Sequence, residues 1–376
     1  MAVVVDRHAI LRDARLIVVK VGTSSVTDEK LLLSDRKVGK LVDELSSLMK
    51  RGYMFIIVSS GAIGAGMGEL GLKARPRDVN KLQAIAAVGQ NELMKIYGKH
   101  FRRHGINVGQ ILLTRDDFRD RMRYLNVRNT MQSLLEMGVI PIVNENDSIG
   151  VDEIRLGDND TLSAFVASNM GAHLLVLLSS VDGVYTRDPH RRKGAVRISV
   201  VDKFGRKMDL IRGKSMGGGV GGIQSKINAA RIATKSGIPV ILANSSERNV
   251  VRRLLEGEEL GTIFLSKSRM EGRLHWVLFS SSPKGCISVD SGAVRALTER
   301  NASLLPSGVT GVKGSFKKGD TICILDESGL EFARGITNYG SEDIELIKGM
   351  QTSDVEKALG KKSYKEIVYS GNMDLT

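Results

Sequence analysis

The sequence lacks several features that would place the chain in a special class of protein. It holds only two cysteines, Cys286 and Cys323, too few to frame a disulfide scaffold or to complete a four-ligand zinc site. We expect both to be small buried core residues. No apolar run approaches the roughly 20 residues that a membrane helix needs. The apolar residues 2–5 end at Asp6 and are too short for a secretory signal, so we expect a cytoplasmic protein with no membrane partner.

What remains is an ordinary globular composition with an excess of positive charge. Apolar residues make up 42% of the 376 residues and charged residues 26%. The net charge of +13 raises nucleic acid as a partner. Residues 281–376, however, hold 12 Lys/Arg against 13 Asp/Glu, so the excess lies in residues 1–280. Small anionic substrates explain a basic body equally well, and nucleic acid is the less favoured partner.

The larger, N-terminal part of the sequence alternates between apolar runs and helical patterns. Short β-branched apolar runs predict strands at 15–24, 55–58, 108–113, 139–143, 174–178 and 240–242. Caps and helical spacing predict helices at 34–50, 78–104, 120–137, from just after 160 to 171, and 223–236. Strands that are apolar throughout and alternate with helices predict an α/β domain with an open, mainly parallel sheet sandwiched by helices.

The pattern changes beyond about residue 275. Short strands with turn residues between them are predicted at 285–289, 303–309, 319–324 and 332–335, with one helix at 292–300. This segment predicts a small, mainly β domain. We place the boundary in the serine-rich stretch at Ser281, which gives domains at 14–275 and 281–365.

Candidate functional residues follow the strand ends, where ligands bind in parallel α/β sheets. Lys20 ends the first strand, and residues 144–147 and 158–160 bring several carboxylates to the same crevice. Lysines or Mg²⁺ would offset the repulsion between these carboxylates. A glycine run at 217–222 precedes a helix with Lys226 in its first turn, where the helix dipole disfavours a cation. A lysine in this position suggests an anion nearby, such as a phosphate bound at the helix N-terminus.

Six motifs carry a family resemblance. They are KVGTS at 20–24, VSSGAIGAG at 58–66, VNENDS at 143–148, GDND at 157–160, DGVYTRDP at 182–189 and GGGVGGIQSK at 217–226. In these motifs and in their order the sequence resembles the glutamate 5-kinases of the amino-acid kinase superfamily, from about Ala14 to the C-terminus. The segment after Ser281 resembles the PUA domain that many bacterial members carry. The resemblance implies the amino-acid kinase fold followed by a PUA-like domain.

The resemblance also implies a role for each motif. Lys20 and Lys226 would neutralise charge on the transferring phosphoryl group and Asp160 would orient both ammonium groups, in a reaction that depends on positioning and electrostatics. Glutamate would be held by Ser60, Gly61, Ala62, Asp147 and Asn159. ATP would be held by Lys20, Ser179, Ser180, Val220, Gly221, Gly222, Ile223, Gln224, Ser225 and Lys226. The pair Ser179-Ser180 stands where other members often have Thr-Asp, which leaves open how the adenine or ribose is held.

The reaction implied is transfer of the ATP γ-phosphoryl group to the γ-carboxylate of L-glutamate, giving L-glutamyl 5-phosphate in the first step of proline biosynthesis. The acceptor carboxylate is already ionised at neutral pH, so the step needs no general base. Mg²⁺ would bind chiefly through ATP oxygens, and no protein ligand to a metal is assigned. By the same resemblance we expect inhibition by proline and a homo-oligomer.

Two other functions compete with this one. Within the same fold, the acceptor could be aspartate, N-acetylglutamate, carbamate or uridylate, although Asp147 favours a substrate with a free α-ammonium group. Outside it, an RNA-binding or RNA-modifying PUA protein fits less well, because the C-terminal segment is near neutral and shows no catalytic Asp motif of a pseudouridine synthase. An inactive α/β scaffold would require all six motifs to be present by chance.

Overall fold

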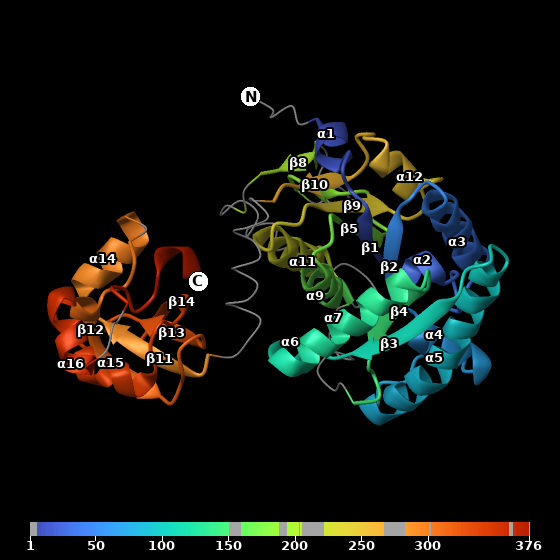
Figure 1. Ribbon diagram of the computed structural model, residues 1–376. Helices are drawn as coiled ribbons and strands as arrows, with labels where there is room; N and C mark the ends of the chain where they lie inside the picture. Colours follow the sequence, from blue (N-terminus) through green and yellow to red (C-terminus); the bar gives the residue numbers. More distant parts are fainter. Residues whose placement is uncertain are drawn as a thin grey trace. The chain divides into compact units, whose positions relative to one another are not determined.

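A computed structural model describes the chain over residues 6–149, 159–187, 194–202, 204, 222–266, 283–300, 302–360 and 364–375. These residues form two compact units, one formed mostly by residues up to 272 and the other by residues from 273 on (Figure 1). Helices in the described ranges are all too short or too polar to cross a membrane. The predicted domain boundary at Ser281 lies outside the described residues and stays a prediction.

The first unit is built on an eight-stranded sheet with the order β3-β4-β2-β1-β5-β9-β10-β8. All neighbours from β3 to β9 pair in parallel, whereas β10 runs antiparallel to β9. The bounds are β1 Leu16–Val21, β2 Met54–Ser59, β3 Val108–Leu113, β4 Ile140–Glu145, β5 Leu174–Ser179, β8 Val200–Val201, β9 Val240–Asn244 and β10 Thr262–Phe264. A separate pair, β6 Val184–Tyr185 and β7 Arg197–Ile198, is antiparallel. The open, mainly parallel sheet predicted from the apolar runs is confirmed.

The helices of this unit agree with most of the predicted ranges. They are α1 Arg7–Leu11, α2 Thr23–Val26, α3 Asp35–Met49, α4 Ala62–Glu69, α5 Val79–Arg102, α6 Asp116–Arg119, α7 Arg121–Glu136, α9 Asn159–Met170, α11 Ile223–Lys235 and α12 Val250–Leu255. Ser34 and Asp78 cap α3 and α5, each accepting a hydrogen bond from a backbone amide three residues on. The short α1, α2, α4, α6 and α12 were not predicted.

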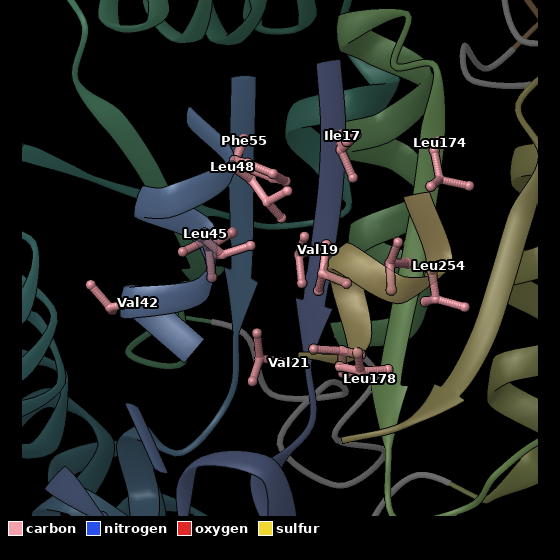
Figure 2. Close-up of a cluster of buried hydrophobic side chains, with 14 of the residues drawn as sticks. Ile17, Val19, Val21, Val42, Leu45, Leu48, Phe55, Leu174, Leu178 and Leu254 are labelled. Carbon is pink, nitrogen blue, oxygen red and sulfur yellow. The ribbon is translucent and has the colours of Figure 1, made fainter. Parts of the chain in front are cut away.

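Strand periodicity decides which face of the sheet each β1 residue meets. Ile17, Val19 and Val21 belong to one hydrophobic cluster with residues of α3, α5 and α12. Figure 2 shows part of that cluster, in which these β1 side chains lie among Val42, Leu45 and Leu48 of α3 and Leu254 of α12. Because side chains alternate along a strand, Lys20 must point to the opposite face, which α9 and α11 cover. The alternation thus separates the packing side of β1 from its chemical side.

Two glycines let α4 and α5 pack with their backbones almost in contact. A Cβ atom added to Gly89 would lie 1.8 Å from the Ala62 carbonyl oxygen and 2.2 Å from the Gly66 nitrogen. A Cβ atom on Gly66 would lie 2.0 Å from the Ile85 carbonyl oxygen. Only glycine fits at either position. The close approach brings the middle of α5 against the turn between β2 and α4.

The second unit is a five-stranded sheet in the order β12-β11-β13-β14-β15 with short helices around it. Its strands are β11 Gly285–Val289, β12 Val309–Gly314, β13 Thr321–Leu325, β14 Glu331–Ile336 and β15 Met373–Leu375. Its helices are α14 Ser291–Arg300, α15 Ser341–Ile347 and α16 Val355–Leu359. The predicted strand at 303–309 is wrong: a 3₁₀ turn occupies Pro306–Gly308 and β12 begins at Val309. Proline has no amide hydrogen to give to a strand ladder, which explains the later start.

The two cysteines form a disulfide, which corrects the expectation of two unpaired core residues. Cys286 of β11 and Cys323 of β13 are register partners on neighbouring parallel strands, with Cα atoms 4.5 Å apart. That separation is within the range a disulfide spans. Pairing across the sheet could not be deduced from two cysteines 37 residues apart in the sequence.

Candidate active site

The carboxyl ends of the central strands bring the predicted residues to one edge of the sheet. Lys20 lies opposite Val58 of β2 and Leu177 of β5 in the strand register. Ser60 therefore follows β2, and Ser179 ends β5, on either side of the end of β1. At this edge the amide of Gly22 donates to the Leu178 carbonyl oxygen at 3.1 Å and that of Ser60 to the Val21 carbonyl oxygen at 3.1 Å. The ends of β2, β1 and β5 are thus joined by backbone hydrogen bonds.

A buried carboxylate joins two lysines from distant parts of the sequence. Lys20 Nζ lies 2.5 Å from Asp160 Oδ1, and Lys226 Nζ lies 3.1 Å from Asp160 Oδ2. The three residues are 6%, 5% and 1% exposed in the order Lys20, Lys226, Asp160. Asp160 lies in the first turn of α9, where the helix dipole favours a negative charge. The sequence predicted an anion near Lys226, at the start of α11. The Asp160 carboxylate is at least part of that negative charge.

The charge state of Asp160 follows from these contacts. Burial by itself opposes ionisation of the carboxyl group, but the charges of Lys20 and Lys226 outweigh it. Hydrogen bonds from Lys20 and from the Ser225 hydroxyl, 2.6 Å from Oδ2, act in the same direction. Together they hold the pKa of Asp160 well below its ordinary value. The cluster carries two positive charges and one negative charge at neutral pH, so it retains a net attraction for an anion.

Next to the cluster, Asn159 anchors the turn after β2. Its Nδ2 lies 2.6 Å from the Ser59 carbonyl oxygen, 3.1 Å from Ser60 Oγ and 2.9 Å from Asn144 Oδ1. Gly61 follows in the left-handed region with φ 106°, which a side chain would strain, and leads into α4 at Ala62. The structure thus brings together Ser60, Gly61, Ala62 and Asn159 as predicted.

Four polar residues of the site were not predicted as functional. Asn144 Nδ2 donates to Gln90 Oε1 at 2.8 Å, and Ser59 Oγ lies 3.0 Å from the Tyr97 hydroxyl. Burial raises the pKa of Tyr97 to about 12, so it stays a neutral partner for Ser59. Asn144 stood in a noted motif, but Gln90 and Tyr97 lie on α5 and reach the site only through the packing of that helix. Gly89, directly before Gln90 in α5, was the available signal, because an interior helix glycine often marks a close approach.

A polar cavity of about 240 Å³ opens beside this network. It is lined by amide side chains of α5 and β3, including Gln90, Asn91 and Gln110, by Glu145 at the end of β4, and by Asp147 after it. Asp147 therefore lies on the wall of a cavity large enough for an amino acid. Gln90, on the same wall, is linked through Asn144 to Asn159. The role of Asp147 in substrate binding stays a prediction.

The nucleotide side of the site is described only in part. Gly222 caps α11, and Ile223, Gln224, Ser225 and Lys226 form its first turn. Ser179 is buried at the end of β5 and Ser180 is exposed. Val220 and Gly221 lie outside the described residues. Ser225, predicted to bind ATP, donates its hydroxyl hydrogen to Asp160 and so supports the charged cluster.

The protein groups suited to a metal ion are limited. No set of three or more His, Cys, Asp or Glu side chains in the described ranges is placed to hold one. Both oxygens of Asp160 are occupied by lysines and by Ser225. A divalent cation accompanying a nucleotide would therefore depend mainly on phosphate oxygens.

Comparison with known proteins gives matches to both units. Residues 15–244 match the amino acid kinase family and residues 285–359 match the PUA domain. The chain is 44% identical to glutamate 5-kinase of Caldanaerobacter subterraneus subsp. tengcongensis, over 95% of this chain and 96% of that protein. It is 44% identical to glutamate 5-kinase of Methanococcoides burtonii, over 98% of this chain and 99% of that protein. A more distant likeness is the solved structure of UMP kinase from Bacillus anthracis, with 17% identity, a TM-score of 0.46, and coverage of 68% of this chain and 97% of that one.

These matches, the parallel sheet and the charged cluster at its carboxyl edge define the class of the protein, which is a kinase. The chain belongs to the amino acid kinase family and, within it, to the glutamate 5-kinases.

Proposed function

We infer that the chain transfers the γ-phosphoryl group of ATP to the γ-carboxylate of L-glutamate, forming L-glutamyl 5-phosphate and ADP, the first step of proline biosynthesis. The observation that carries this proposal is the meeting of the Lys20 and Lys226 ammonium groups at the Asp160 carboxylate. Their net positive charge lies at the sheet edge, where a phosphate and an acidic acceptor would otherwise repel each other.

In the reaction, a γ-carboxylate oxygen of glutamate attacks the γ-phosphorus while the bond from that phosphorus to the β,γ-bridging oxygen breaks. ADP leaves with the bonding electron pair. The glutamate carboxylate is ionised near pH 7, so no proton has to be removed from the nucleophile. Lys20 and Lys226 stabilise charge on the transferring group, and Asp160 keeps both ammonium groups in place before the substrates arrive.

On the acceptor side, Asp147 pairs with the α-ammonium group of glutamate. Ser60, Asn159 and the backbone amides of Gly61 and Ala62 hold the rest of the amino acid next to the cluster. The cavity that Asp147 lines supports this assignment. A carboxylate in this wall favours a free amino acid over an N-acetylated one, because an acetylated nitrogen carries no charge to pair with it.

On the nucleotide side, Ser179, Ser180 and the segment from Val220 to Lys226 bind ATP, and Mg²⁺ enters with it. Bound Mg²⁺ neutralises phosphate charge during transfer. The occupied oxygens of Asp160 support a metal held chiefly by ATP. Feedback inhibition by proline, a homo-oligomeric state, a cytoplasmic location and domains at 14–275 and 281–365 complete the proposal, and rest on the family resemblance of the sequence.

The test is an acceptor panel in the presence of hydroxylamine, which converts acyl phosphates into coloured hydroxamates. With ATP and Mg²⁺, we expect signal with L-glutamate and little with L-aspartate or N-acetyl-L-glutamate. Omitting Mg²⁺ should abolish the signal. Hydroxamate from N-acetylglutamate but not from glutamate would overturn the substrate assignment.

A further inference from the structure

Three side-chain amides form a continuous hydrogen-bonded chain from α5 to the start of α9. Gln90 Oε1 accepts from Asn144 Nδ2 at 2.8 Å, and Asn144 Oδ1 accepts from Asn159 Nδ2 at 2.9 Å. Gln90, Asn144 and Asn159 are 8%, 2% and 8% exposed. The chain thus runs through the interior from the wall of the polar cavity to the residue beside Asp160.

Two backbone groups fix the direction of every amide in this chain. The Glu145 amide donates to Asn144 Oδ1 at 2.9 Å, so Asn144 must present Nδ2 toward Gln90. The Ser59 carbonyl oxygen accepts from Asn159 at 2.6 Å, so Asn159 must present Nδ2 on that side. Backbone groups cannot exchange donor for acceptor. A reversed amide anywhere in the chain would set two donors or two acceptors against each other.

The fixed direction decides what Asn159 can offer a ligand. Three acceptors surround its Nδ2, which has only two hydrogens, so the donor side of this amide is used within the protein. Its Oδ1 is buried and has no hydrogen-bond partner in the described part of the chain. A buried acceptor without a partner is costly, and a substrate ammonium group would satisfy it.

Gln90 is the outer end of the series of hydrogen-bonded amides, and it has no other polar partner among the described residues. Its Nε2 is buried and unpartnered, so its one hydrogen bond is the one that holds Asn144. Its place is set by the neighbouring Gly89, whose missing side chain lets α5 approach Ala62. A glutamine buried in this way for the sake of packing alone would be unfavourable relative to an apolar residue of similar size.

We propose that Gln90 is a positioning residue for the acceptor substrate, which holds Asn144 so that Asn159 keeps its carbonyl oxygen available to the α-ammonium group of glutamate. This inference rests on the proposed function. Gln90 lies on the wall of the cavity, and in this proposal it acts on the substrate through Asn144. Its loss therefore weakens glutamate binding and leaves the nucleotide side and the Lys20–Asp160–Lys226 cluster in place.

The experiment is a double-mutant cycle on the full chain, using Gln90→Met, which keeps the length of the side chain but removes the acceptor, and Asn144→Ala. Steady-state hydroxamate assays give kcat and separate KM values for glutamate and ATP. Calorimetric titration of glutamate gives affinity without turnover. Gln83→Met, the same change two turns earlier on α5, is the control for helix effects.

We expect Gln90→Met to raise the glutamate KM and Kd by about tenfold, the loss of one buried hydrogen bond, with kcat and the ATP KM within about twofold of wild type. Asn144→Ala should have at least as large an effect, and adding Gln90→Met to it should change nothing further. Gln90→Asn, one methylene too short to reach Asn144, should repeat the tenfold loss and replaces the Met variant if that one does not fold.

Two results would overturn the inference: a glutamate KM within twofold of wild type in Gln90→Met, or a Gln90→Met effect that persists in the Asn144→Ala background. The second would mean that Gln90 acts independently of Asn144. If wild-type protein instead makes no hydroxamate from glutamate, the proposed function fails, which is a different outcome from an unchanged KM in an active enzyme.

Discussion

Replacing Gly89 with alanine should destabilise the first unit, although the same substitution elsewhere on α5 should stabilise it. A Cβ atom at Gly89 would lie 1.8 Å from the Ala62 carbonyl oxygen, whereas real Cβ contacts are essentially never under 3.0 Å. The two backbones would have to separate by about 1.2 Å, the difference between those distances. At Gly98, on the same helix, the nearest atom to an added Cβ is Val108 Cγ2 at 3.8 Å.

The two sites share the intrinsic preference of helices for alanine, about 1 kcal/mol over glycine. Gly98→Ala should therefore raise the free energy of unfolding by about 0.5–1 kcal/mol. Gly89→Ala gains the same helix-propensity contribution, but it also overpacks the contact with α4. Overpacking costs about 1–3 kcal/mol, occasionally more where backbone has to move. We expect a net loss of about 1–2 kcal/mol, toward the upper end of the overpacking cost because backbone has to move, and a raised glutamate KM because Gln90 moves with α5.

Urea unfolding of both variants and wild type, followed by circular dichroism, measures the difference. The prediction is midpoints that shift in opposite directions. A Gly89→Ala protein as stable as Gly98→Ala would refute the close contact between α4 and α5, and with it the account of how Gln90 is placed.

The remaining predictions concern charge and covalent linkage. Asp160→Asn leaves two buried ammonium groups without their carboxylate and should cost about 3–5 kcal/mol at pH 7. Because the pKa of Asp160 is lowered by folding, its stabilising effect is present above the unfolded value of about 4 and is lost as pH falls toward the folded value. The gap between variant and wild type in urea unfolding should therefore narrow below about pH 4, and a gap independent of pH would contradict the ion pairs. Asp147→Asn should raise the glutamate KM about 10- to 100-fold with the ATP KM unchanged, the loss of a charge-assisted hydrogen bond; equal changes in both KM values would argue against the α-ammonium contact. Cys323→Ser opens a link between residues 37 apart and should destabilise the second unit by about 3–4 kcal/mol, seen as a lower unfolding midpoint than wild type under non-reducing conditions and no difference under reducing ones.

Local sequence signals were sufficient for the regular elements of the first unit. The continuous apolar runs of β1 and β5 and the capping residues Ser34 and Asp78 reflect short-range chemistry, and the structure confirms them. The eight-residue α4 was missed because Gly64, Gly66 and Gly68 make it a poor helix by propensity. Its packing against α5 overrides that propensity, and packing cannot be seen in a local window.

The site residues also fall into two groups, those with a local sequence signal and those positioned only by tertiary packing. Lys20, Asp160 and Lys226 were noticed as candidates at strand ends and helix starts, their roles were implied by the family resemblance, and the structure brings the three together. Gln90 was missed because the neighbouring Gly89 indicates that some element approaches α5 closely but not which one, and the contact of Gln90 with Asn144 of β4 is a tertiary property. The disulfide was missed for the same reason, since the pairing of β11 with β13 is a tertiary property.

The central claim is that two lysines, 206 positions apart in the sequence, act on one transferring phosphoryl group. Its most direct test is kcat for hydroxamate formation from glutamate by Lys20→Met and Lys226→Met. Lys40→Met, an exposed change on α3, is the matched control. Each catalytic variant should keep its fold and lose about 100-fold or more in kcat, the usual cost of removing one preorganised charge-stabilising group. Folded variants with kcat within about threefold of wild type would contradict the claim.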